Sequence, residues 1–84
     1  MTLSKYDSKI YLPDNLLYLR TINKLTQHQL AEVCNKKNTA VSNWERGIRE
    51  PNLSDLGNIA KFFEISVEDL IFLDLRKQKK KIKN

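Results

Sequence analysis

The stretch from Cys34 to Gly47, CNKKNTAVSNWERG, is rich in short side chains that donate and accept hydrogen bonds. Treated as a helix at about 100° per residue, it has an apolar stripe on one side and a polar face on the other. The stripe consists of Ala40, Val41 and Trp44, and the polar face of Thr39, Ser42, Asn43 and Arg46. Amides and hydroxyls are mediocre helix formers, and an ordinary solvated face would carry Glu, Lys, Gln and Ala. The polar face is therefore typical of a surface that binds a polar partner through hydrogen bonds.

The rest of the chain lacks the residue patterns of disulfide, metal-binding or catalytic sites. Cys34 is the only cysteine, which excludes an internal disulfide, and together with His28 it is too little for a zinc site. No nucleophile is paired with a base, no carboxylate pair marks a cleft, and no phosphate-binding loop is present. We therefore predict that the protein is not an enzyme and uses neither a metal nor a cofactor.

Charge is distributed unevenly along the chain. The net charge of +5 comes from residues 74–84, DLRKQKKKIKN, because residues 1–73 hold equal numbers of basic and acidic side chains. Residues 36–49 hold four basic residues against Glu45 alone, whereas residues 50–73 hold five acids against Lys61. We expect a domain with one positive and one negative side, and a positive tail appended to it.

Helix signals begin soon after Pro13. The first helix is expected over about residues 14–23. Thr26 and Gln29 form a capping box for a second helix that ends near residue 34, where Asn35 suits the left-handed conformation that terminates a helix. The inward residues of these two helices are expected to be Leu16, Leu19, Ile22, Leu30, Ala31 and Cys34.

Three more helices are expected in the second half of the chain. The third covers residues 37–46 and stops before Gly47, and the fourth covers about residues 53–63. The predicted caps are Asn52 with Asp55 three residues later, and Ser66 with Asp69. The inward residues are expected to be Leu56, Ile59, Ala60, Phe63, Leu70, Ile71 and Leu73.

These signals predict a single all-α domain of five short helices over residues 13–73. Residues 1–12 are expected to form an irregular or extended arm, because the Leu12-Pro13 step disfavours helix before it. Residues 74–84 are expected to form the basic tail. No apolar run approaches the roughly 20 residues that span a bilayer, and no signal-peptide pattern is present, so a cytoplasmic location is expected.

The pattern from Leu16 to Ile71 resembles the Xre family of helix-turn-helix proteins, which includes phage repressors and Cro proteins. The supporting segments are YLR in the first helix, LTQ..LA in the second, VSNWERG.REP through the third, and L..L..IAKFF.IS.EDL in the fourth and fifth. The tight turn at Asn35 and Lys36 fits the steep crossing of a helix-turn-helix unit. The resemblance implies the lambda-repressor-like fold.

By position, the resemblance implies that residues 37–46 form a recognition helix in the DNA major groove. The implied base-contacting residues are Lys37, Asn38, Thr39, Ser42 and Asn43, and the implied phosphate-contacting residues are Gln27, Lys36, Arg46 and Arg49. Asn can pair with adenine through two hydrogen bonds, Thr offers a hydroxyl and a methyl group, and Lys can donate to guanine. The resemblance also implies a buried ion pair between Arg20 and Glu45 that orients the recognition helix.

Several residues depart from the usual pattern of that family. Lys24, Asn35 and Glu64 stand where the family commonly has glycine, which predicts altered or slightly strained turns at Lys24 and Glu64. Lys36 stands where a buried Val or Ile is usual, and we expect its stem to pack inward while its ammonium reaches the surface beside DNA. Cys34 replaces an aliphatic residue and is expected to be a small buried hydrophobe.

These implications predict a sequence-specific regulator that binds double-stranded DNA, namely a repressor that acts as a homodimer on a palindromic operator. It would be bacterial or phage-encoded and associated with the nucleoid. The alternative is an antitoxin or other interaction module that uses the same fold and autoregulates its operon, with the arm or tail contacting a protein partner. RNA binding is disfavoured because the polar face lacks aromatic stacking platforms.

Two apolar patches are candidates for the dimer contact. One combines Phe62, Phe72 and Leu75 with the fifth helix, and the other consists of Tyr6, Ile10 and Tyr11 in the arm. The tail from Arg76 to Lys83 has three open interpretations: an extension attracted to DNA, a solvated helix end, or the start of a linker into a further domain.

Overall fold

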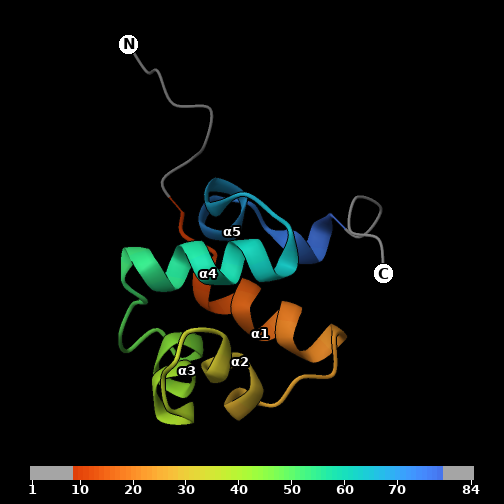
Figure 1. Ribbon diagram of the computed structural model, residues 1–84. Helices are drawn as coiled ribbons and strands as arrows, with labels where there is room; N and C mark the ends of the chain where they lie inside the picture. Colours follow the sequence, from red (N-terminus) through yellow and green to blue (C-terminus); the bar gives the residue numbers. More distant parts are fainter. Residues whose placement is uncertain (1–8, 79–84) are drawn as a thin grey trace.

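The computed structural model describes residues 9–78, and within this range it contains five α-helices, one short 3₁₀-helix and no strand. The elements are α1 (Leu12–Ile22), α2 (Gln27–Val33), α3 (Asn38–Glu45), α4 (Leu53–Phe63), α5 (Val67–Phe72) and the 3₁₀-helix η1 (Leu75–Lys77). The prediction of an all-α domain with five short helices is confirmed. In Figure 1, α2 and α3 lie together below α4, and α5 lies above it.

The predicted caps are present at the starts of three helices. The Thr26 hydroxyl accepts a hydrogen bond from the Gln29 amide at 3.0 Å, and the Gln29 side chain accepts from the Thr26 amide at 2.8 Å. Asn52 and Asp55 form the same reciprocal box before α4. The Ser66 hydroxyl accepts from the amide of Asp69 at 3.0 Å. Local sequence therefore determines where these helices begin.

Three turns are closed by residues other than glycine in the left-handed conformation. Lys24, Asn35 and Glu64 have φ angles of 57°, 57° and 60°. A side chain with a Cβ atom is strained there by roughly 1–2 kcal/mol, although Asn tolerates the conformation better. The strain predicted at Lys24 and Glu64 is thus present. After α3 the left-handed position is occupied by a glycine, Gly47, with φ of 74°.

The core lies between α1 and the other helices. Every residue predicted to face inward on α2 is buried, and Trp44 on α3 is only 4% exposed. Two predictions for α1 were wrong. The helix begins at Leu12, with Pro13 in its first turn, where a missing amide donor breaks no helical hydrogen bond. Ile22 is 36% exposed, because residues three apart fall about 60° short of a full turn and drift off the buried face.

The chain after α5 folds back onto α1 through the buried side chain of Asn15. Its amide nitrogen donates to the carbonyl of Leu70 at 2.8 Å and to that of Leu73 at 2.7 Å, and its oxygen accepts from the amide of Leu75 at 3.1 Å. Leu75 is consequently only 2% exposed. Its predicted place in an exposed dimer patch was wrong, because Leu75 belongs to the core, whereas Arg76 and Lys77 beside it are exposed.

Cys34 is buried as predicted. From this burial we predict how the free energy of unfolding changes at alkaline pH. Removal from water, assisted by the nearby charge of Asp55, raises the pKa of Cys34 from 9.0 to about 11. Between these values the unfolded chain loses the thiol proton while the folded chain retains it. The free energy of unfolding should therefore fall by up to about 1.4 kcal/mol per pH unit as the pH rises from 9 to 11.

Urea unfolding of the wild type and of Cys34→Ala, measured from pH 8 to 10.5, separates this effect from the titration of Lys and Tyr. The wild type should lose stability more steeply than the variant above pH 9. Equal slopes would show that the thiol does not titrate differently in the two states.

Candidate nucleic-acid interface

The structure places the predicted polar residues on one accessible side of α3 and on the turn before it. Lys37, Asn38 and Thr39 are exposed, while Ser42 and Asn43 are half-buried. Asn38 with Ser42, and Thr39 with Asn43, are four residues apart and therefore neighbours on the helix surface. The opposite stripe is buried against the core at Val41 and Trp44. The arrangement leaves short amide and hydroxyl groups available to an external partner.

An ion pair with little solvent exposure holds the C-terminal end of α3. The guanidinium of Arg20 donates from Nε to Glu45 Oε2 at 2.6 Å and from Nη2 to Glu45 Oε1 at 3.0 Å. Their side chains are only 15% and 5% exposed. The hydrogen bond to Glu45 raises the pKa of Arg20 further above its ordinary value, so the guanidinium stays charged. A two-point contact of this kind restricts rotation of α3 against α1.

Two further hydrogen bonds extend this contact to α2. Arg20 Nη1 donates to the carbonyl of Leu25 at 2.9 Å, just before α2. Gln27 Nε2 donates to Glu45 Oε1 at 3.1 Å. Gln27 was predicted as a phosphate contact, and its link to Glu45 had no signal in the sequence, because the two residues lie 18 positions apart. The network joins α1, α2 and α3 at one point.

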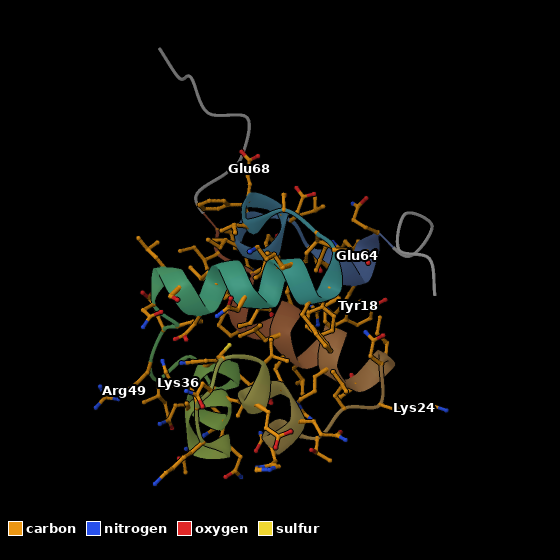
Figure 2. The ribbon with its side chains drawn as sticks, viewed as in Figure 1. Tyr18, Lys24, Lys36, Arg49, Glu64 and Glu68 are labelled. Atoms are coloured by element: carbon orange, nitrogen blue, oxygen red, sulfur yellow. The ribbon has the colours of Figure 1, made fainter. Side chains whose placement is uncertain are left out.

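The predicted phosphate-contacting cations fall into two groups. Arg46 and Arg49 are exposed, and Figure 2 shows the Arg49 side chain pointing away from the protein. Lys36 is different, because its Nζ lies 3.0 Å from each carboxylate oxygen of Asp55. Asp55 was predicted only as a capping residue, and a partner 19 positions earlier cannot be deduced from capping rules.

The labelled charges in Figure 2 are separated by sign. Lys36 and Arg49 lie beside α3, whereas Glu64 and Glu68 lie at the end of α4 and on α5. A positive side attracts a polyanion, and a negative side repels it. Lys24, the third labelled cation, lies at the turn after α1, so Lys36 and Arg49 are the two labelled cations on the same side as the short polar groups of α3.

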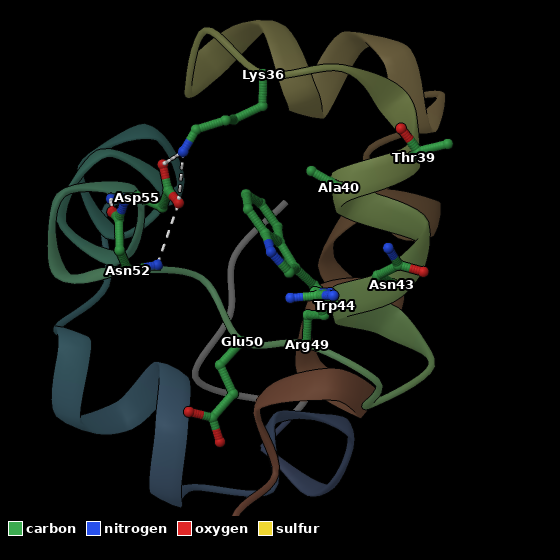
Figure 3. Close-up of a pocket in the computed structure, with 9 residues that line it drawn as sticks. All are labelled: Lys36, Thr39, Ala40, Asn43, Trp44, Arg49, Glu50, Asn52 and Asp55. Carbon is green, nitrogen blue, oxygen red and sulfur yellow. Dashed lines mark hydrogen bonds and ion pairs between the residues drawn. The ribbon is translucent and has the colours of Figure 1, made fainter.

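A cavity of about 340 Å³ lies between α3 and the start of α4. Thr39 and Asn43 contribute to it from α3, Asn52 and Asp55 contribute from the start of α4, and Trp44 lies between them (Figure 3). No group of three metal-ligating side chains occurs within residues 9–78. In the same range, no helix has both the length and the apolar character needed to cross a bilayer.

The family model described as helix-turn-helix matches residues 16–70. The chain belongs to the helix-turn-helix family. The unit consists of α2, the turn at Asn35 and Lys36, and α3, which confirms the resemblance to the Xre family. This is a family of DNA-binding transcriptional regulators rather than enzymes.

Relatives and solved structures agree with this membership. The chain is 43% identical over 58 residues to the HTH-type transcriptional activator BcrR of Enterococcus faecalis, covering 69% of this chain but only 28% of that protein. It is 38% identical over 65 residues to control protein C.SmaI of Serratia marcescens, covering 77% of each. The structure of the P22 c2 repressor in complex with synthetic operator 9T matches with a TM-score of 0.70 and 28% identity, over 75% of this chain and 96% of that one. The phage-repressor-like fold of this helix-turn-helix domain is thereby confirmed.

Proposed function

We propose that this helix-turn-helix protein represses transcription by binding a palindromic operator as a homodimer, with α3 in the major groove. The observation that carries the proposal is the accessible polar face of α3, held against α1 and α2 by the network of Arg20, Glu45 and Gln27. The similarity to a repressor solved on its operator supports repression. Occupation of a promoter would block polymerase by steric exclusion, and a protein that acts in this way would lie with the nucleoid in the cytoplasm.

The contacts follow from the accessible groups. Asn38, Thr39 and Asn43 would contact base edges, with Lys37 and Ser42 beside them. The exposed Arg46 and Arg49 would contact phosphates, and the Gln27 amide retains a second N–H that can donate to another. Phosphate contacts set affinity and position, whereas the base contacts supply sequence preference.

Asn43→Ala should weaken binding to the operator by about 1–3 kcal/mol and relax the preference at one base position, because a two-point hydrogen bond to a base is lost. Arg46→Ala is the matched control, since it should weaken all sequences alike and flatten the salt slope by about one unit. Fluorescence anisotropy with operator and single-base variants measures both. A uniform loss of affinity across sequences in Asn43→Ala would contradict its place against the bases.

A twofold dimer requires two half-sites about one helical turn, roughly 34 Å, apart. We place the dimer contact at Phe62, which is 49% exposed on α4 and packs edge to face on Phe63 at 5.0 Å. In the alternative patch, Ile10 is 52% exposed, Tyr11 is half-buried with its amide bonded to the carbonyl of Ile71, and Tyr6 lies outside the described residues.

Phe62→Asp should weaken dimerisation more than about tenfold, because it would put an unpaired carboxylate in an apolar contact. Ile10→Asp is the matched control and should leave the dimer intact. Sedimentation equilibrium over a range of concentrations measures both. Dissociation of the dimer by Ile10→Asp alone would place the contact in the arm instead.

The antitoxin alternative depends on contacts made by the arm or the tail. Residues 1–8 of the predicted arm and 79–84 of the predicted tail lie outside the described residues. In the described part, Tyr11 and Leu12 at one end and Leu75 at the other pack on the domain. Because both functions include DNA binding, a stable complex with a protein partner that requires the arm or the tail is the result that would favour the antitoxin alternative.

A further inference from the structure

The turn between α2 and α3 holds a cation at a position where the resemblance implies a buried aliphatic residue. Lys36 follows the left-handed Asn35, and its own amide donates to the carbonyl of Ala31 at 2.9 Å. Its side chain is 36% exposed, and Nζ lies 3.0 Å from both carboxylate oxygens of Asp55 (Figure 3). The ammonium of Lys36 therefore forms an ion pair with Asp55.

Asp55 depends on this cation because its carboxylate is buried. The side chain is only 5% exposed, and one of its oxygens also accepts from the Asn52 amide at 3.1 Å. The Asp55 amide in turn donates to the Asn52 side chain at 2.8 Å. A buried carboxylate without a cationic partner is strongly unfavourable. Lys36 thus allows a charged cap to start α4 inside the domain.

The ion pair joins two segments that frame the polar face of α3. One is the turn that leads into α3, and the other is the first turn of α4, where Asp55 also accepts from the amide of Asn52 at the end of the loop that carries Arg49. The loop is also bonded to α3, since the amides of Ile48 and Arg49 donate to the carbonyl of Asn43 at 2.9 and 3.4 Å. Thr39, Asn43 and Arg49 line the same cavity as Lys36 and Asp55.

We infer that Lys36 is a positioning residue for DNA binding: its ion pair with Asp55 fixes the Arg49 loop and the start of α4 relative to α3. Its ammonium neutralises Asp55 instead of a DNA phosphate. This inference rests on the proposed function, because it concerns how the same surface is held for DNA. It differs from the position-based expectation that Lys36 contacts a phosphate, and the two make opposite predictions about salt.

The test compares the salt dependence of operator binding in the wild type, Lys36→Met, Asp55→Asn, the double variant and Lys36→Arg. Arg46→Ala, at an exposed cation assigned to a phosphate, is the control for the salt slope, and Lys37→Met, at the adjacent exposed lysine, is the control for the tryptophan measurement below. Lys36→Met should weaken binding roughly tenfold at one salt concentration, with the slope of affinity against salt unchanged. Asp55→Asn should weaken binding to a similar degree, the double variant should lose no more than either single variant, and Lys36→Arg should retain affinity. Arg46→Ala, which removes a proposed phosphate contact, should flatten the slope by about one unit.

Two results would overturn the inference. Flattening of the slope by about one unit in Lys36→Met, with unchanged affinity in Asp55→Asn, would assign Lys36 to a phosphate. Unchanged affinity in both variants would show that the ion pair positions nothing that DNA binding requires. Circular dichroism confirms that each variant compared is folded, and Lys36→Arg supplies the comparison if Lys36→Met does not fold.

A readout without DNA separates this inference from the proposed function. Trp44 is the only tryptophan of the chain, is 4% exposed and lines the same cavity. Its acrylamide quenching should increase in Lys36→Met and Asp55→Asn but not in Lys37→Met. If the wild type binds no DNA sequence, the proposed function fails, while unchanged quenching in both pair variants would contradict the positioning role independently.

Discussion

Glu45→Ala should lower the free energy of unfolding by about 3–5 kcal/mol, because it leaves the guanidinium of Arg20 buried without its partner. The carboxylate accepts from two nitrogens of Arg20 and from Gln27, and its side chain is 5% exposed. All three hydrogen bonds are lost together. In a domain of this size a loss of that magnitude is a large part of the total stability. Urea unfolding measured by circular dichroism gives the value directly.

Two controls distinguish an unpaired charge from a general effect of truncation. Arg20→Met combined with Glu45→Leu removes both charges and should cost much less than Glu45→Ala, since replacing a buried pair with apolar groups is often close to neutral. Glu32→Ala removes an exposed carboxylate of α2 and should change stability by less than about 0.5 kcal/mol. Equal losses in the double variant and in Glu45→Ala would show that the penalty does not come from the orphaned guanidinium.

Asn15→Ala should destabilise the domain by roughly 3–5 kcal/mol, because two buried main-chain groups and a part-buried one lose their hydrogen-bond partner at once. These groups are the carbonyls of Leu70 and Leu73 and the amide of Leu75. They hold the end of α5 and the 3₁₀-helix η1 on α1. The variant should release this end of the chain first, so hydrogen exchange at the Leu75 amide should accelerate more than exchange in α2 and α3.

Asn58→Ala is the matched control for this prediction, because Asn58 is an exposed asparagine within α4. It should leave stability within about 0.5 kcal/mol of the wild type. Faster exchange at Leu75 in the absence of a stability loss would show local opening alone. Unchanged exchange at Leu75 in Asn15→Ala would contradict the role of Asn15 in anchoring η1.

The helices could be predicted because their determinants are local. Thr26 with Gln29, Asn52 with Asp55, and Ser66 with Asp69 each satisfy free amides within one turn of chain. The amphipathic split of α3 likewise follows from helix periodicity, which places Val41 and Trp44 in the core.

The interactions between distant segments could not be predicted in the same way. Asn15 binds groups 55 to 60 positions later, so its role depends on the path of the chain after α5. That path also buries Leu75, although the charged neighbours of Leu75 suggest exposure. Lys36 and Asp55 are ordinary charged residues in sequence, and only the packing of α4 against the α2–α3 turn brings them into contact.

The candidate site shows the same division. The exposure of Asn38, Thr39 and Arg46 follows from helix periodicity, and these residues are accessible in the structure. The hydrogen bond of Gln27 to Glu45 and the ion pair of Lys36 with Asp55 join residues far apart in sequence, so only the structure reveals them. Sequence therefore predicted which side chains of α3 are accessible, while the structure shows which contacts hold α3 in place.

Selection from random duplex DNA with the purified protein, at about 150 mM salt to suppress non-specific binding, tests the central claim most directly. A repressor dimer with α3 in the major groove should recover a palindrome with one fixed spacing of roughly 34 Å between half-site centres. The Asn43→Ala variant should lose preference at one position of each half-site. Recovery of no enriched sequence by folded protein, or of half-sites without a fixed spacing, would contradict the proposal of a dimeric operator-binding repressor.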